Sequence, residues 1–411
     1  MNPPDRPEKS DAASTRRVAI GCALVALATC GIAVAGTIGS RDWNVTVLVR
    51  MASVDKIAPL ARAADPTFGF VHPHAHYDGV YFYAIARDPL ARSRAHDLID
   101  LSAYRYGHPL YGWLAWLGSG GRPRAVPWAL LAVNLVAVIV GAVAASAFAI
   151  RLGHSGWWGL IVALSPGIVF STTADVGEPV LLAFVALSLL AWTKQRWFWA
   201  GLALIGVSFS KEPMLLIPAG LLVWELFQRL RGQRDGSVVK RLAAILSGPI
   251  LFAGWYVYLH GRFGEWPFKE NQDFLSGPLA GWVDTFRRAA RLSRSTFDKS
   301  QLGSITVPLL ALVAVALVAG VVRSIRLRTW IHVVFLFLAL FTVLLGWQQL
   351  LFPKELTRDL AVQIALVPAV FAATPVLRGE DRGDAGSTGV QIERTADQKP
   401  DGGETVPEEN R

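Results

Sequence analysis

The chain has 411 residues, of which 53% are apolar and 17% carry a charge. Soluble domains carry about 25% charged residues, and here the charges lie between apolar stretches close to the length of a membrane span. The composition therefore excludes a soluble globular enzyme and an outer-membrane β-barrel. Cys22 and Cys30 lie in one apolar run, so neither a disulfide framework nor a cysteine-based metal site is expected. The net charge of +9 collects at the ends of apolar segments, where it sets membrane orientation and does not indicate nucleic-acid binding.

The first 125 residues predict a tail, an anchor helix and a long loop. Residues 1–17 are polar and are expected to be a disordered N-terminal tail. Residues 18–38 are apolar over a length that can span a bilayer and predict an uncleaved anchor. Residues 39–125 hold no stretch long enough to span. Within them, residues 108–117 carry the Tyr and Trp side chains typical of an interfacial helix.

The remainder of the chain predicts an all-α, polytopic membrane protein with about ten transmembrane helices, counting the anchor. The further spans are expected at residues 126–150, 157–173, 179–193, 197–209, 213–227, 242–260, 305–322, 330–352 and 360–377. Residues 379–411 are rich in Gly, Asp and Glu, too polar to bury a core, and predict a disordered tail.

The short basic clusters predict the orientation of these spans. If the N-terminus is cytoplasmic, every short basic cluster falls on the cytoplasmic side of the ten-span arrangement. Both termini are then cytoplasmic, as expected for a multi-pass protein of the plasma membrane. Residues 39–125 and 261–304 become two large outer loops, and residues 18–378 form the membrane domain.

Asp78 is the first candidate for chemistry because it stands in an aromatic setting in the first outer loop. Tyr77 precedes it, and Tyr81 and Tyr83 follow. Reduced dielectric in such a setting predicts a pKa raised toward the range of a general base. Gly79 is expected to let a substrate approach the backbone closely. A turn or helix cap at Asp78-Gly79 is an equally open interpretation.

The alternating histidines His72, His74 and His76 would share one face of an extended segment. With Asp78 they offer ligands for a divalent metal ion, which is the only cofactor that the sequence suggests, and His74 and His76 are its candidate ligands. The alternative, which we favour, is a solvated loop that happens to be rich in histidine.

Two later acidic positions also interrupt apolar sequence. Asp175 and Glu178 share one short turn, and capping of the next helix explains one of these carboxylates but not both. Lys211 and Glu212 interrupt an apolar stretch, where they either pair with each other or bind a phosphate group.

Cations recur at the same predicted membrane level. Arg358 stands in a charged segment with Lys354, Glu355 and Asp359, which suits phosphate binding or interfacial snorkelling. Arg105 and His108 add positive charge before the interfacial helix. Such a set of groups suits a reaction in which cations hold a lipid-borne phosphate and a carboxylate deprotonates an acceptor hydroxyl.

In these features the chain resembles the GT-C class of integral-membrane glycosyltransferases, and within it the bacterial proteins of the dolichyl-phosphate-mannose-type mannosyltransferase group. The resemblance rests on an anchor helix, the aromatic segment 77–83 around Asp78, the Tyr/Trp segment 108–113, the Ser-Pro span with its acidic turn at 165–178, and the small-residue segment 201–211 ending in Lys211. Two departures are Gly79, where many members carry a second acid, and His108-Pro109, where many carry Lys-Pro.

The resemblance implies an inverting transfer of a hexose or pentose from a polyprenyl-phosphate donor to a lipid, glycan or protein of the cell envelope, at the outer face of a bacterial plasma membrane. It implies the role of catalytic base or metal ligand for Asp78 and a supporting role for Asp175 and Glu178. The expected substrate-binding residues are Arg105, His108, Lys211, Glu212 and Arg358.

Two other functions stay open at this point. A lipid or solute transporter or flippase would also place charged residues at helix ends, although the broken region 208–213 has no counterpart elsewhere in the chain. A non-catalytic membrane protein of envelope assembly would tolerate replacement of Asp78, Glu178 and Lys211.

Overall fold

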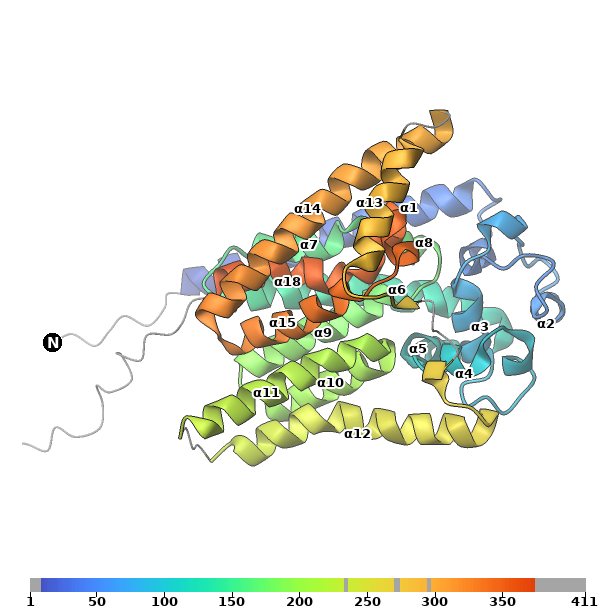
Figure 1. Ribbon diagram of the computed structural model, residues 1–411. Helices are drawn as coiled ribbons and strands as arrows, with labels where there is room; N and C mark the ends of the chain where they lie inside the picture. The colour runs from blue at the N-terminus through green and yellow to red at the C-terminus, as the bar shows by residue number, and fades with distance from the viewer. Residues whose placement is uncertain (1–8, 233–235, 270–273, 294–296, 374–411) are drawn as a thin grey trace, which may run out of the picture. The chain divides into compact units, whose positions relative to one another are not determined.

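The computed structural model describes residues 9–232, 236–269, 274–293 and 297–373 (Figure 1), which all belong to one of the two units of the chain, Met1–Thr374. All regular elements in these ranges are helices. Two isolated bridges, Ala52–Val71 and Leu275–Leu345, are the only β-type pairings among the described residues. The predicted all-α class is therefore confirmed for this part of the chain.

Five helical segments of the described chain are long and apolar enough to cross a bilayer: Ser14–Gly39, Pro123–Arg151, Glu212–Leu230, Val238–Phe263 and Gly303–Leu327. They correspond to helices α1 (Lys9–Gly39), α6 (Val126–Arg151), α11 (Leu216–Leu230), α12 (Val238–Phe263) and α14 (Phe297–Leu327), and in α1 and α14 the apolar segment begins after the start of the helix. Gly156–Val162 and Pro166–Thr173 make a sixth if they are taken as one broken span with a bend of 53°. The break precedes Pro166, where the proline ring disfavours helical backbone in the residue before it.

Four apolar helices are shorter: α9 (Glu178–Thr193), α10 (Trp197–Ser210), α15 (Trp330–Val343) and α18 (Ala361–Ala372). The 16 residues of α9 rise only about 24 Å, against a hydrocarbon core of about 30 Å. The structure thus gives five or six candidate spans and does not confirm the expected ten. Residues 330–352 are also not one helix, because α15 ends at Val343 and α16 (Trp347–Leu351) begins after Gly346.

The ends of the chain differ from the expectation at one point. Helix α1 already begins at Lys9, so residues 9–17, which were expected to be disordered, are helical. Residues 1–8 and the predicted tail 379–411 lie outside the described residues.

The first loop folds into short helices that gather at the right of Figure 1. They are η1 (Val45–Val49), α2 (Ala58–Ala64), η2 (Pro73–Ala75), α3 (Gly79–Arg87), η3 (His96–Leu98), α4 (Ser102–Arg105), α5 (Leu110–Ser119) and η4 (Pro123–Ala125). Helix α5 occupies the segment predicted as interfacial. Tyr111 and Ala115 on α5 are buried, whereas Trp116 and Leu117 are exposed, a division that suits a helix at a membrane surface.

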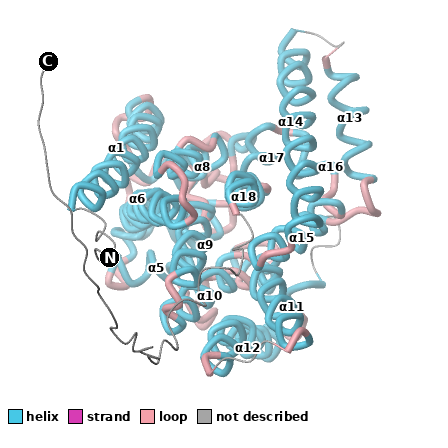
Figure 2. Tube along the Cα trace, turned by 90° about the vertical axis from the view of Figure 1, so that its left-hand side faces the viewer, coloured by secondary structure: helices cyan, strands magenta, loops and turns pink. Residues whose placement is uncertain are grey.

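The remaining elements are η5 (Gly156–Trp158), α7 (Gly159–Ala163), α8 (Pro166–Thr173), η6 (Glu212–Leu215), η7 (Pro267–Lys269), α13 (Ala280–Leu292) and α17 (Pro353–Asp359). Helix α13 belongs to the second predicted loop and lies alongside α14 in both views (Figures 1 and 2).

Two large apolar clusters and a small third one hold the helices together. One joins the bundle through side chains such as Leu204, Ile217 and Phe335. The other packs α3 and α5 of the first loop against the bundle through side chains such as Tyr111 and Trp255. Helix α6 packs against α1 and α9, and α10 lies between α9 and α12. This packing places the loop helices next to the ends of α9 and α10, where the charged turns lie.

Candidate functional site

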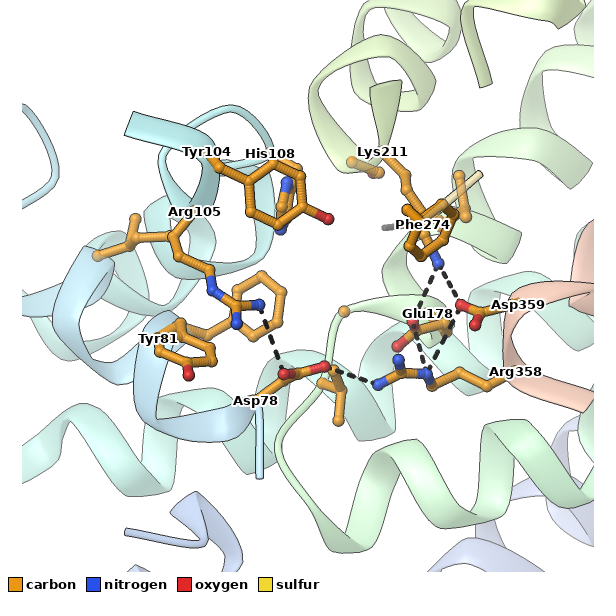
Figure 3. Close-up of a pocket in the computed structure, with 16 residues that line it drawn as sticks. Asp78, Tyr81, Tyr104, Arg105, His108, Glu178, Lys211, Phe274, Arg358 and Asp359 are labelled. Atoms are coloured by element: carbon orange, nitrogen blue, oxygen red, sulfur yellow. Dashed lines mark hydrogen bonds and ion pairs between the residues drawn. The ribbon is translucent and has the colours of Figure 1, made fainter. Parts of the chain in front are cut away.

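A polar cavity lies where the first loop meets the helix ends (Figure 3). Its ionisable lining residues, other than tyrosines, come from widely separated parts of the chain and are Asp78, Arg105, His108, Glu178, Lys211, Arg358 and Asp359. The cavity has a volume of about 60 Å³, which is room for about five water molecules. The site is therefore nearly filled by its own side chains.

Asp78 stands at the N-cap position of α3, but its side chain accepts no capping hydrogen bond. The interpretation of Asp78 as a simple cap therefore fails, and the carboxylate lines the cavity instead. Gly79 has a structural role. A Cβ atom at Gly79 would lie 2.5 Å from the carbonyl oxygen of Ala174 and 2.7 Å from that of Val49. The sequence suggested that Gly79 lets a substrate come close to the backbone. In the structure, the backbone of Ala174 and Val49 occupies that space instead.

Asp78 lies between two guanidinium groups. Its Oδ2 atom is 2.9 Å from Nη1 of Arg358, and its Oδ1 atom is 3.5 Å from Nη1 of Arg105. The Arg105 guanidinium in turn lies 3.6 Å from the centre of the Tyr81 ring. The aromatic ring of Tyr81 near Asp78 therefore also holds the positive charge of Arg105 close to the carboxylate.

These cations reverse the predicted pKa shift of Asp78. Burial raises the pKa of the Asp78 carboxyl, but the positive charges of Arg358 and Arg105 outweigh burial and hold the pKa below its ordinary value. The expectation of a raised pKa is wrong because it counted the apolar faces of the neighbouring rings and not the arginine stacked on one of them.

Arg358 connects most of the acids of the site. Besides Asp78, it lies 3.5 Å from Glu178, 3.2 Å from Glu355 and 3.8 Å from Asp359. Only 11% of its side chain is exposed. Because a buried guanidinium needs compensating charge, Arg358 and the acids around it act as one unit.

Lys211 completes this network on the side of α10. Its Nζ atom is 2.7 Å from Oδ1 of Asp359 and 3.7 Å from Oε1 of Glu178. The cavity lining thus holds three carboxylates and three permanent cations, so an anionic ligand has to take the place of carboxylates already bound to these cations.

Lys211 and Glu212 do not pair with each other in the structure. Glu212 is absent from the cavity lining, and its Oε1 atom lies 3.3 Å from Nδ1 of His108 and 2.9 Å from the hydroxyl of Tyr256, which donates to it. His108 lines the cavity and Glu212 lies behind it. Glu212, which was expected to bind substrate, therefore meets the polar cavity through His108 and itself lines a second, neighbouring pocket.

Asp175 is fully buried and does not line the cavity. Its backbone has a φ of 47°, and neither carboxylate oxygen has a hydrogen-bond partner among the described residues. Burial raises the pKa of Asp175 well above its ordinary value. The turn therefore brings Glu178 to the cavity and leaves Asp175 inside the protein, so the position of Asp175 gives no support to the catalytic role that was expected for it.

The histidines do not share the geometry that a metal site requires. Pro73–Ala75 form a turn of 3₁₀ helix, so the segment is not extended. The Nδ1 atom of His76 lies 2.9 Å from Asp55, and His74 is exposed. In the part of the chain that the structure describes, no group of three His, Cys, Asp or Glu side chains is arranged to hold a metal ion. The residues at His74 and His76 do not fit the metal interpretation.

Asp359 lines the cavity and belongs to the charged segment around Arg358 that the sequence singled out, although no role of its own was expected for it. Phe274 is a lining residue that the sequence did not single out. Phe274 comes from the second predicted loop and had no local signal.

An apolar groove of about 570 Å³ adjoins the polar cavity and shares Tyr104, Lys211 and Phe274 with it. Its other walls are mostly apolar and include Leu215, Phe252, Ala253, Val257, Phe268 and Phe341. Val257 is exposed on α12, a candidate span. In a membrane this part of the groove faces lipid.

No protein-family model, curated protein sequence or solved structure matches this chain. The interpretation of the site therefore rests on its geometry and charge.

Proposed function

We propose that the chain is a glycosyltransferase of the plasma membrane that takes a sugar from a polyprenyl-phosphate donor. The acceptor is a hydroxyl of an envelope lipid, glycan or protein, and the transfer inverts the anomeric carbon. The observation that carries this proposal is the shared wall of the polar cavity and the apolar groove at Tyr104, Lys211 and Phe274. A polyprenyl-phosphate donor has an anionic head that matches the polar cavity and an apolar chain that matches the groove.

The side of the membrane follows from charge. In Figure 1 the end of α11 and the beginning of α12 lie at the left, opposite the first-loop helices. These ends carry Arg229 and Arg231 on one helix and Lys240 and Arg241 on the other. The positive-inside rule assigns this end to the cytoplasm, so the cavity lies at the outer face and both termini are cytoplasmic.

Donor binding requires exchange of ion-pair partners. A sugar phosphate does not fit into about 60 Å³, so side chains have to separate. The phosphate is expected to take Arg358 and Lys211 from Asp78, Glu178 and Asp359. The exchange keeps each buried cation compensated. The displaced carboxylates lose their cations, so protonation has to neutralise them in part, because an unpaired buried carboxylate is costly.

The same exchange activates Asp78. While Arg358 and Arg105 bind Asp78, its low pKa makes it a weak base. The phosphodiester monoanion of the donor on Arg358 offsets part of that positive field, and the pKa of Asp78 then rises. Base strength is in this way linked to the presence of donor.

The reaction is a single displacement. The acceptor oxygen bonds to the anomeric carbon as the bond from that carbon to the phosphate oxygen breaks. Polyprenyl phosphate leaves with the electron pair and is held by Lys211 and Arg358, and the hydroxyl proton passes to Asp78. Glu178 and Asp359 keep the two cations in position between turnovers.

The test uses the purified full-length protein in nanodiscs with farnesyl phosphate and with farnesyl-phosphate hexoses and pentoses. We expect farnesyl phosphate to bind, Arg358→Gln to weaken binding at least tenfold, and one sugar donor to release farnesyl phosphate when envelope extract supplies acceptors. Absence of binding by every prenyl phosphate would contradict the proposal.

A second candidate is a carrier of anionic lipids, which the double ion pair of Asp78 favours because it leaves that carboxylate a poor base in the donor-free state. A carrier would move prenyl phosphate across proteoliposomes without cleaving a sugar donor. Release of farnesyl phosphate from a donor distinguishes the two.

A further inference from the structure

A separate pocket of about 860 Å³ lies where two candidate spans meet the first loop. The first span ends at Gly39 and the second begins at Pro123. Arg41 and Trp43 follow the first span, and Arg122, Arg124 and Trp128 stand at the beginning of the second. All five line the pocket. It shares no lining residue with the polar cavity or the apolar groove.

Positive charge at this pocket is not fully compensated. Arg124 lies 4.0 Å from Asp65, whose carboxylate also accepts hydrogen bonds from the backbone and hydroxyl of Thr67. Within the described ranges, Arg41 and Arg122 form no ion pair, and both are exposed. Asp42 also lines the pocket but pairs with neither arginine there. Two guanidinium groups are thus available to an anion.

The floor of the pocket is fixed by internal hydrogen bonds. The amide of Asn44 donates to the carbonyl of Thr67 at 2.7 Å, and the backbone N–H of Gly69 donates to the hydroxyl of Thr46 at 2.7 Å. A Cβ atom at Gly69 would lie 2.7 Å from Val47. The two loop segments are therefore closely packed and form a well-ordered floor for the pocket.

Two exposed indoles place the pocket at the membrane surface. Trp43 is 66% exposed and Trp128 is 59% exposed. Tryptophans next to spans lie at the level of lipid headgroups, and arginines close to a bilayer surface bind anionic headgroups. Aromatic surface beside unpaired guanidinium suits a phosphate that carries acyl chains better than a free phosphate ion.

We propose that this pocket binds the headgroup of an anionic phospholipid in the leaflet on the side of the first loop. Arg41 and Arg122 contact the phosphate, while Trp43 and Trp128 lie against the upper part of the acyl chains. The bound lipid holds the first loop at the membrane surface. The proposal does not depend on the glycosyltransferase activity.

The experiment follows tryptophan quenching in the purified full-length protein, using phosphatidylglycerol or phosphatidylcholine brominated near the top of the acyl chains. Subtracting the signal of a Trp43→Phe/Trp128→Phe variant isolates the two pocket indoles. We expect phosphatidylglycerol to quench them at a lower concentration than phosphatidylcholine. Arg41→Gln/Arg122→Gln is expected to raise the phosphatidylglycerol midpoint about thirtyfold.

The matched control is Arg229→Gln/Arg326→Gln, which removes two arginines at other helix ends and is expected to leave the midpoint unchanged. Equal quenching by the two lipids, or an unchanged midpoint after loss of Arg41 and Arg122 in a variant that keeps the wild-type melting temperature, would overturn the proposal. If glycerol phosphate displaced phosphatidylglycerol at equal concentration, the pocket would bind a soluble phosphate ester as well as a lipid, and the assignment of a phospholipid as its ligand would be wrong.

Discussion

Asp78 and Arg358 are 280 positions apart in the chain, and their Oδ2 and Nη1 atoms lie 2.9 Å apart. This contact joins the beginning of α3 in the first loop to α17 near the end of the described chain. Through the same guanidinium, Asp78 comes next to Glu178, which lies 3.5 Å from Nε of Arg358. One buried arginine therefore joins the two carboxylates that the sequence suggested and the structure brings to the cavity.

Replacing Asp78 by Asn should abolish the proposed base while keeping the side-chain shape. We expect Asp78→Asn to insert and fold and to lower sugar transfer about 100-fold or more. The measurement is release of farnesyl phosphate from its sugar donor. Asp175→Asn is the matched control, because Asp175 does not line the cavity. A transfer rate that falls equally in both variants would remove the specific role of Asp78.

Loss of Arg358 should destabilise the protein as well as weaken donor binding. Arg358→Gln leaves four acids without their shared cation, a change expected to cost about 3–5 kcal/mol. Lys354→Gln is the comparison, since Lys354 is 44% exposed and its ion pair within the described ranges is with Glu355 at 3.6 Å. Its Nζ atom also lies 4.6 Å from the centre of the Tyr77 ring, and the substitution should cost at most about 1 kcal/mol. Thermal unfolding in detergent measures both. Equal melting temperatures for the two variants would contradict the assignment of Arg358 as the centre of the network.

Asp175 should make stability depend on pH in a defined direction. Its folded-state pKa is raised by burial, so above about pH 4 the unfolded chain releases a proton that the folded protein retains. This release favours unfolding and lowers stability as pH rises. Asp175→Asn removes the effect and should melt above the wild type at pH 7, with the difference shrinking toward pH 4. The prediction would be contradicted if Asp175→Asn melted below the wild type at pH 7 and at the same temperature as the wild type at pH 4.

Gly79 should tolerate no side chain. A Cβ atom would meet two backbone oxygens, of Ala174 and Val49, within 2.7 Å, so Gly79→Ala is expected to cost about 1–3 kcal/mol and to lower transfer by shifting Asp78. Gly36→Ala on α1 is the control, as nothing lies within 4 Å of its Cβ position. Melting temperature and transfer rate report the two effects. A wild-type melting temperature and transfer rate for Gly79→Ala would show that the backbone of Ala174 and Val49 moves aside at little cost.

The apolar groove should determine preference for long donor chains. Val257→Trp fills the groove and is expected to raise KM for a farnesyl donor at least tenfold while changing KM for a citronellyl donor much less. Val239→Trp on the same helix lies outside the groove and should leave both values unchanged. An equal change in KM for the short and the long donor would show that the groove does not bind the donor chain.

Several features of this protein follow from local sequence because hydropathy and charge act over one or two turns. The apolar runs correctly placed the long helices around residues 18–38, 126–150 and 242–260. The Tyr/Trp pattern located α5. The charged interruptions drew attention to Asp78, Glu178, Lys211 and Arg358, which do line one cavity.

Tertiary packing decided what those charges do. Asp175 and Glu178 stand three positions apart and are both buried, yet the turn brings only Glu178 to the cavity. Lys211 and Glu212 are neighbours, yet each pairs with distant partners. The sign of the pKa shift at Asp78 depends on Arg358 and Arg105, because the field at a carboxylate is set by charges within a few ångströms in space, whatever their separation along the chain.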